Sequence, residues 1–298
     1  MAPHDEIRPL APEHFPTLLC EITDPPKQLW LRGELPSTER TWLAVVGSRK
    51  HTSYGADAAR TLIEGLRGYP IVIVSGLALG IDAIAHEAAL KAGLPTVAVP
   101  GSGITDAAIY PRTNAGLAAR ILDAGGALLT EYEPDFRATQ WSFPRRNRIM
   151  AGLAHATLVI EADALSGTLI TARLAMEYNR DVLAVPGSIF SPSSDGPNAL
   201  IADGAGLVRS SEDLLRHLGF DEIDAAETPG DADHFSEDTL AEYSDAERAI
   251  LLILREPLAT DEVALRAELA ADEANIALMR LAIAGAIRET RDGWMRER

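Results

Sequence analysis

Residues 42–49 read Trp-Leu-Ala-Val-Val-Gly-Ser-Arg, an apolar run that ends in a glycine, a serine and an arginine. Such a run is typical of a strand that is buried on both faces of a sheet. A helical pattern follows from Tyr54 to Leu66, and the same unit recurs as far as Leu218. The alternation predicts an α/β fold with a doubly wound, mostly parallel sheet that helices cover on both faces.

The repeats of this unit define the predicted elements. Further strands are expected at residues 71–74, 96–99, 127–130, 157–160, 182–185 and 207–208. Helices are expected at residues 82–92, 115–124, 169–178, 198–202 and 211–218, with one more that ends at Ala154.

Small residues follow several of these strands. In a doubly wound sheet, ligands bind at the carboxyl edge, where small residues let backbone N–H groups approach a phosphate. One such pair is only a turn, but their recurrence predicts a binding site at this edge. The pairs are Gly47-Ser48, Ser75-Gly76, Gly101-Ser102, Ser166-Gly167 and Gly187-Ser188.

A basic cluster lies at residues 143–148, Phe-Pro-Arg-Arg-Asn-Arg. Guanidinium groups match phosphate oxygens two at a time, and a ring offers a nucleobase a face to stack on. The segment Gly47-Ser48-Arg49-Lys50 is a second basic element. If both segments lie on one sheet edge, they predict a site for a polymer that carries phosphates.

The cluster also has a simpler interpretation. Arg145, Arg146 and Arg148 could be a solvated helix face that pairs with acidic residues nearby in the sequence. Trp141 and Phe143, interleaved with the arginines, favour base stacking instead. Phe143 could equally pack onto the helix that it precedes. The acidic candidates for pairing are Glu131, Glu133 and Asp135.

The net charge of −17 does not exclude a nucleic-acid partner, because the acidity is localised. Residues 212–247 hold 13 acidic residues and one arginine, whereas residues 42–210 hold 14 basic and 15 acidic ones. Cys20 is the single cysteine, which excludes an internal disulfide. The chain shows neither a stretch of about 20 apolar residues nor a signal-peptide pattern, and a cytoplasmic protein is expected.

Four segments are predicted along the chain. Residues 1–40, with seven prolines, predict an N-terminal arm, and residues 41–220 form the α/β domain. Residues 221–243 have the composition of an acidic linker. Residues 244–298 predict a winged-helix domain of three helices and a hairpin that turns at Asp292-Gly293. Its third helix offers only Arg280, so DNA contact by this domain is not expected.

No cofactor, metal or catalytic residue is predicted. The chain contains neither G-x-G-x-x-G nor a P-loop sequence, and its histidines are scattered. Asp82 and His86 are four residues apart, but we interpret them as a helix cap and a satisfied side chain at the rim of the site.

The chain from Phe15 to Leu218 resembles the DNA-processing protein A family, also called Smf. Dense motifs in the family's order carry the resemblance: Val46-Gly47-Ser48-Arg49, Ser75-Gly76-Leu77-Ala78, Gly80-Ile81-Asp82, Tyr110-Pro111, Phe143-Pro144-Arg145-Arg146-Asn147-Arg148, Ser166-Gly167 and Val185-Pro186-Gly187.

The resemblance implies an extended Rossmann-like domain that binds single-stranded DNA, forms a homodimer and loads RecA onto strands covered by single-strand-binding protein. It implies that Ser48 and Arg49 contact phosphates and that Phe143 stacks on a base. It further implies a pocket completed by Arg145, Arg146 and Asn147, and backbone donors at Ser75, Gly76, Ser166, Gly167 and Gly187. Leu79 stands where many relatives have a basic residue.

An enzyme of nucleotide metabolism is the alternative, since nucleoside-monophosphate phosphoribohydrolases resemble this sheet architecture. Such an enzyme needs a carboxylate at the sugar, for which Glu161 and Glu177 are the candidates. For the DNA-binding hypothesis, Arg49→Ala or Arg146→Ala is expected to weaken oligonucleotide binding without a change in melting temperature.

Overall fold

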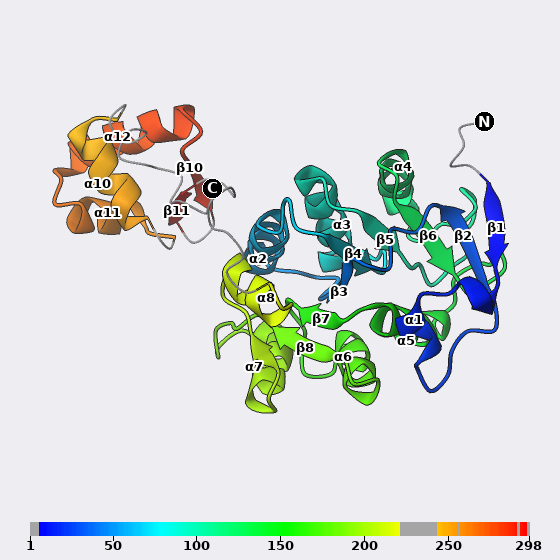
Figure 1. The fold of residues 1–298 in the computed structure, drawn as a ribbon. Helices are drawn as coiled ribbons and strands as arrows, with labels where there is room; N and C mark the ends of the chain where they lie inside the picture. The colour runs from blue at the N-terminus through cyan, green and yellow to red at the C-terminus, as the bar shows by residue number, and fades with distance from the viewer. Residues whose placement is uncertain (1–5, 221–242, 255–256, 291–292, 297–298) are drawn as a thin grey trace. The chain divides into compact units, whose positions relative to one another are not determined.

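The computed structural model of the chain describes residues 6–220, 243–254, 257–290 and 293–296 (Figure 1). The chain divides into two compact units, residues 1–224 and residues 225–298, which are described separately. Among the described residues, no helix combines the length and the apolar character that crossing a membrane requires.

The first unit is built on one sheet of nine strands, in the order β1-β2-β6-β5-β4-β3-β7-β8-β9. The strands from β6 to β9 in this order are parallel, as the apolar runs predicted. The strands are β1 (Ile7–Leu10), β2 (Leu29–Gly33), β3 (Thr41–Val46), β4 (Ile71–Ser75), β5 (Thr96–Ala98), β6 (Ala127–Thr130), β7 (Ala156–Val159), β8 (Asp181–Ala184) and β9 (Gly206–Leu207).

The N-terminal segment contributes to this sheet. The sequence pattern indicated only an arm, but β1 and β2 extend the sheet beyond β6 by antiparallel pairing. Leu29 and Leu31 of β2 are buried, while Trp30 and Arg32, which alternate with them, are only partly covered. Two short helices, η1 (Pro12–His14) and α1 (Thr17–Cys20), connect the two strands.

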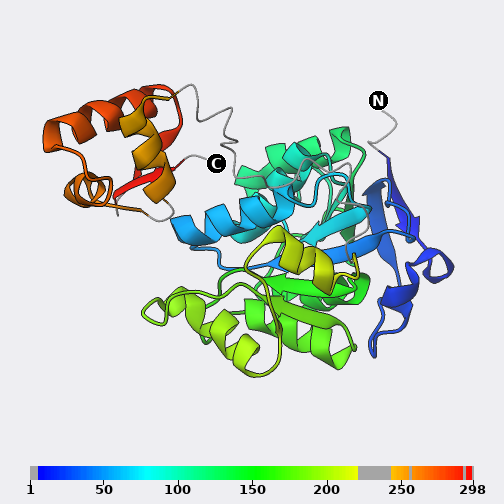
Figure 2. The ribbon, with the colours of Figure 1, turned by 60° about the vertical axis from the view of Figure 1, so that its left-hand side comes forward.

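Helices cover both faces of the sheet (Figures 1 and 2). Leu43 and Val45 of β3 pack on one face, while Trp42 and Val46 pack on the other. The first face carries α2 (Ser53–Glu64), α3 (Ile81–Ala92), α4 (Ala115–Asp123) and α8 (Ser211–His217). The second carries α1, α5 (Ser142–Leu153), α6 (Thr168–Glu177) and α7 (Asp195–Ala202). The doubly wound fold is thereby confirmed.

The strand order changes direction once between β3 and β7. From β3 the chain builds outward through β4, β5 and β6, and α5 then returns it to β7 on the other side of β3. Ligands of open α/β sheets bind in the crevice at such a switch point, outside the carboxyl ends of the strands. Residues 47–50 and 160–167 follow the two strands at this point.

The second unit contains α10 (Asp245–Ile253), α11 (Thr260–Arg266), α12 (Ala271–Ile283) and the antiparallel pair β10 (Ile287–Thr290) and β11 (Gly293–Arg296). Ser244 and Glu247 form the predicted capping box of α10. Of the predicted linker at residues 221–243, all but Tyr243 lie outside the described residues, as does the turn residue Asp292. The winged-helix assignment stays a prediction.

Candidate nucleic-acid interface

The two basic segments meet on one edge of the sheet. The guanidinium carbon of Arg49, which follows β3, lies 4.8 Å from the centroid of the Phe143 ring in the first turn of α5. This distance is within the range of a cation–π contact. The ring of Tyr110 lies against the same phenylalanine, with 5.8 Å between centroids. Residues 47–50 and the start of α5 therefore share a common rim.

Two glycines allow the loops after β3 and β4 to interlock. A Cβ atom on Gly47 would come within 2.6 Å of the Ile81 side chain. Gly80 has a φ of +81°, and a Cβ there would come within 2.3 Å of the Ser48 carbonyl oxygen. The Ile81 N–H donates to that carbonyl at 3.2 Å. The position of Arg49 is thus set by close backbone packing that side chains larger than hydrogen would disrupt.

The loop after β7 is tied to this rim across the switch point. The Thr168 hydroxyl donates to the Gly47 carbonyl at 3.1 Å. The side-chain amide of Asn147 donates to the Gly167 carbonyl at 3.4 Å. Ser166 accepts a hydrogen bond from the Thr168 N–H through its hydroxyl. Asn147 and Ser166 therefore hold the loop in place, and Gly167 lies on its exposed side.

Two of the predicted backbone donors, Gly76 and Gly187, are used inside the fold, and so is the hydroxyl of Ser75. Ser75 donates its hydroxyl to the Val45 carbonyl at 2.6 Å. The Gly76 N–H donates to the Asp82 carboxylate at 3.1 Å. The Gly187 N–H donates to the side-chain oxygen of Asn198 at 3.2 Å. In this arrangement none of these groups offers a phosphate its proton, and they shape the edge of the sheet instead.

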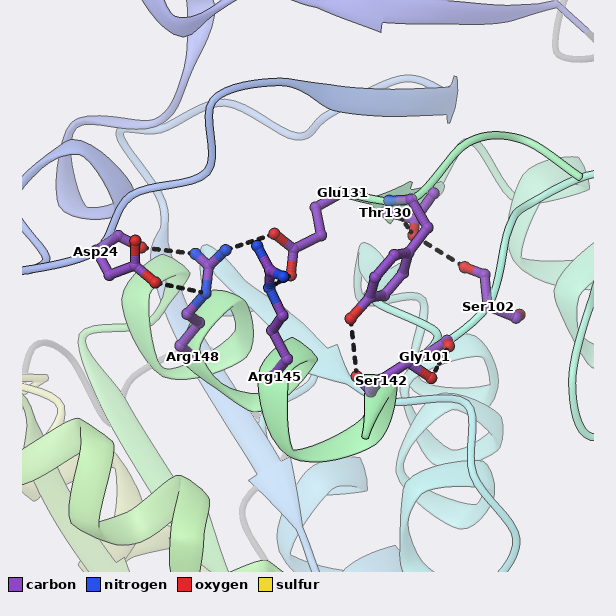
Figure 3. A network of polar contacts seen from close by, with 9 residues as sticks. Asp24, Gly101, Ser102, Thr130, Glu131, Ser142, Arg145 and Arg148 are labelled. Carbon is purple, nitrogen blue, oxygen red and sulfur yellow. Dashed lines mark hydrogen bonds and ion pairs between the residues drawn. The ribbon is translucent and has the colours of Figure 1, made fainter. Parts of the chain in front are cut away.

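Arg148 is held inside the fold by two carboxylates (Figure 3). Its guanidinium pairs with Glu131, lies 3.5 Å from a carboxylate oxygen of Asp24, and donates to the Asp24 carbonyl at 2.7 Å. Arg145 approaches Glu131 from the other side at 3.4 Å. Burial raises the pKa of Glu131, an effect that Arg148 and then Arg145 oppose. The pairing with Glu131 that the alternative interpretation expected is therefore present for Arg148, and DNA contact by this residue stays a prediction.

Arg146 is also buried, with 4% of its surface exposed. Its Nη1 donates to the carbonyls of Gly76, at 2.6 Å, and of Val99, so it joins the loops that follow β4 and β5. A Cβ on Gly76 would come within 2.1 Å of this nitrogen. Burial lowers the pKa of Arg146 to about 10, which leaves it charged at neutral pH. In this structure Arg146 clamps two loops, and its part in a DNA-binding pocket stays a prediction.

The exposed part of the rim is consequently small. Arg49 and Lys50 are exposed, and no carboxylate among the described residues forms an ion pair with either. The Ser48 hydroxyl accepts from the Lys50 N–H at 3.1 Å, which fixes the turn. Arg145 keeps 56% of its side chain exposed beside Glu131. Free cationic charge for a phosphate lies mainly at residues 49–50.

Sequence reasoning considered Trp141 for base stacking but did not assign a site role to Tyr110. Both are about half exposed, and Tyr110 extends the ring surface of Phe143. Trp141 packs edge-on against Tyr132 and Phe136, which stack on each other at 4.4 Å. An exposed ring near a cationic rim is the signal that could also have identified Tyr110.

The carboxylates and the histidine considered for catalysis are either buried or far from the carboxyl edge of the sheet. His86 is fully buried with its Nδ1 2.7 Å from the Thr96 hydroxyl, and burial lowers its pKa to about 3, so it does not lie at the rim. Glu161 is buried and accepts from Thr52. Glu177 is the last residue of α6, about 14 Å along the helix from the edge where α6 begins. The residues described here hold no cluster of metal-ligating side chains.

Comparison with known proteins decides the family. Residues 7–219 match the family model described as DNA recombination-mediator protein A. The chain belongs to this family. It is 44% identical over 218 residues to Protein Smf of Escherichia coli, covering 73% of this chain and 58% of that relative. It is also 44% identical over 209 residues to DNA processing protein DprA of Streptococcus pneumoniae, covering 69% of this chain and 72% of the relative.

Solved structures of the family have the same fold. The X-ray structure of DNA processing protein A from S. pneumoniae superposes with a TM-score of 0.67 and 42% identity, covering 72% of this chain and 75% of that one. The Helicobacter pylori protein, described in terms of its single-stranded DNA binding mode, gives a TM-score of 0.63 and 32% identity, with 73% and 98% covered. The match to the DNA recombination-mediator protein A family spans the whole sheet and the rim, and it stops before the second unit.

Proposed function

We propose that this chain binds single-stranded DNA at the rim formed by residues 47–50 and the start of α5. The observation that carries the proposal is the contact between Arg49 and Phe143, which places a cation without a carboxylate partner beside a ring. Phosphates would bind Arg49 and Lys50, and a base would stack on Phe143. The H. pylori relative, described by its single-stranded DNA binding mode, supports this assignment.

The chemistry of the rim favours single strands over duplex. Stacking on Phe143 requires a base face that duplex DNA keeps covered by its neighbours. Each phosphate contact to a single strand lowers the logarithm of the binding constant by about 0.7 per tenfold increase in salt. Two or three contacts therefore give a moderate salt dependence and little preference for sequence.

We further propose that the chain acts without catalysis, as a homodimeric mediator that delivers DNA to RecA on strands covered by single-strand-binding protein. The family description as a recombination mediator supports this role. Two observations argue against the phosphoribohydrolase alternative: Glu161 is buried and accepts from Thr52 and Ser193, and Glu177 lies about 14 Å along α6 from the edge where that helix begins. The test is RecA ATPase activity on covered single strands, which the protein should accelerate. Free base released from AMP by the purified protein would contradict the proposal.

The binding proposal is tested by titrating a labelled oligo-dT strand at two salt concentrations. Arg49→Ala is expected to weaken binding by about five- to tenfold and to reduce the salt slope by about 0.7. Arg60→Ala is the matched control, because Arg60 is an exposed arginine of α2 that pairs with Asp57 away from Phe143. Equal effects of the two substitutions, or equal affinity for duplex DNA, would refute the assignment of the rim.

A further inference from the structure

A hollow lies beside the rim, between the loops that follow β3 and β8. Tyr54, in the first turn of α2, donates its hydroxyl to the Pro186 carbonyl at 2.6 Å and so joins the two loops. The hollow encloses about 410 Å³, a volume in the range of small-ligand sites. Its lining consists of Thr52, Tyr54, Glu161, Gly187, Ser188, Ser191 and Ser194.

The charge in the hollow is arranged for a neutral group with N–H donors. Glu161 is almost fully buried, and its carboxylate accepts the Thr52 N–H at 2.9 Å, the Thr52 hydroxyl at 2.5 Å and the Ser193 hydroxyl at 3.2 Å. A carboxylate has about four acceptor positions, so one remains. A phosphate would be repelled by Glu161 and would stay with Arg49 and Lys50 at the rim.

The large apolar side chains that flank the hollow are exposed to solvent. Ile189 and Phe190 lie between the lining residues Ser188 and Ser191, and they are 80% and 90% exposed. Leu165, on the neighbouring loop after β7, is 99% exposed. Side chains of this size on two adjacent loops are suited to cover a planar ligand.

The spacing of the strands connects the hollow to the rim. β8 is two strands from β3 in the sheet, which corresponds to about 10 Å. Stacked nucleotides are spaced by about 3.4 Å along one strand, so about three nucleotides span this distance. One single strand therefore reaches both places.

We propose that this hollow is a second base-binding subsite for the strand that is held at Phe143. The base lies against the Tyr54 ring, directs an N–H toward Glu161 and is covered by Phe190, while its phosphate remains at the cationic rim. This inference rests on the proposed function, since it needs a bound strand.

The test compares oligo-dT with an abasic oligomer of equal length, which keeps the phosphates and removes the bases. Tyr54→Leu and Phe190→Ser are each expected to weaken binding of oligo-dT by about five- to 150-fold. Neither should change binding of the abasic oligomer. Tyr54→Phe, which keeps the ring, is the control and should bind oligo-dT nearly as the wild type does.

The outcomes separate this inference from the function on which it rests. Wild-type protein that fails to bind oligo-dT refutes the function itself. Salt-dependent binding that both substitutions leave unchanged overturns the subsite alone, and it would assign Phe190 to protein contact. Equal losses on oligo-dT and on the abasic oligomer would also overturn it, because the base would then not be what Tyr54 and Phe190 hold. Phe190→Ser should fold normally, since the replaced side chain is in solvent.

Discussion

Replacing Arg146 with alanine should destabilise the sheet unit strongly, although the residue belongs to the most basic stretch of the chain. Its guanidinium donates to the carbonyls of Gly76 and Val99 inside the fold. A hydrogen bond that involves a charged group contributes about 1.5–3 kcal/mol. Loss of both should lower the free energy of unfolding by about 4 kcal/mol. Asp82 would also lose the charge that most opposes the effect of burial on its pKa.

Arg145→Ala provides the matched control for this prediction. Arg145 precedes Arg146 on the same helix, but more than half of its side chain is exposed and its ion pair with Glu131 spans 3.4 Å. Partly exposed pairs of this kind contribute about 1 kcal/mol or less. The side chain of Arg49 makes no hydrogen bond within the described part of the chain, so Arg49→Ala should leave stability nearly unchanged. From the sequence we expected Arg146→Ala to leave the melting temperature unchanged. From the structure we expect this substitution to lower it.

Urea unfolding followed by tryptophan fluorescence measures the difference. A Trp294→Phe background removes the tryptophan of the second unit, so that the signal reports on the sheet unit, where Trp42 is buried in the core. The variants are compared by their unfolding midpoints, on the condition that the slope of the unfolding free energy against urea concentration is the same for each. If Arg146→Ala and Arg145→Ala unfold at the same urea concentration, Arg146 does not clamp the loops and the argument fails.

Three further predictions follow from single residues. Leu79→Lys adds a cation at a half-exposed position of the β4 loop and should tighten single-strand binding, with a salt slope steeper by about 0.7 in a titration. Phe143→Ala should weaken the binding free energy for oligo-dT by about 1–3 kcal/mol and leave that for an abasic oligomer unchanged. His86, whose pKa is about 3, stays neutral when folded, whereas the unfolded chain takes up a proton below about pH 6.5. Stability should therefore fall by about 2 kcal/mol from pH 6.5 to pH 5 in urea titrations, and His86→Gln should lack this loss.

The strands between residues 41 and 208 could be predicted because most are apolar runs, several of which small residues follow. Burial on both faces leaves an unmistakable pattern in strands such as β3 and β4. β1 was missed because it is an edge strand in which Arg8 and Pro9 hide the apolar pattern. β2, which pairs with β1 and β6, was missed because it is a five-residue strand with Arg32 in it, set in a proline-rich segment. The choice of the carboxyl edge for the candidate site also followed from the strand pattern, since carboxyl ends of parallel strands share an edge.

The roles of individual site residues could be predicted less well. Gly76 and Gly187 were expected to offer N–H groups to a phosphate, yet Asp82 and Asn198 take them. A sequence shows that a glycine allows close approach, but it does not show which group approaches. The partner here is the protein itself, and only the tertiary structure reveals that.

Helix geometry explains why three arginines in one cluster have different partners. Successive residues of an α-helix are rotated by about 100°, so Arg145 and Arg148 lie about 60° apart and Arg146 points elsewhere. Arg145 and Arg148 consequently share Glu131, while Arg146 reaches the loops of β4 and β5. A dense basic stretch on a helix thus overstates the positive charge that one ligand can meet. The exposed cations of the two basic segments are Arg49, Lys50 and part of Arg145, so we expect a salt slope set by two or three phosphates rather than by five.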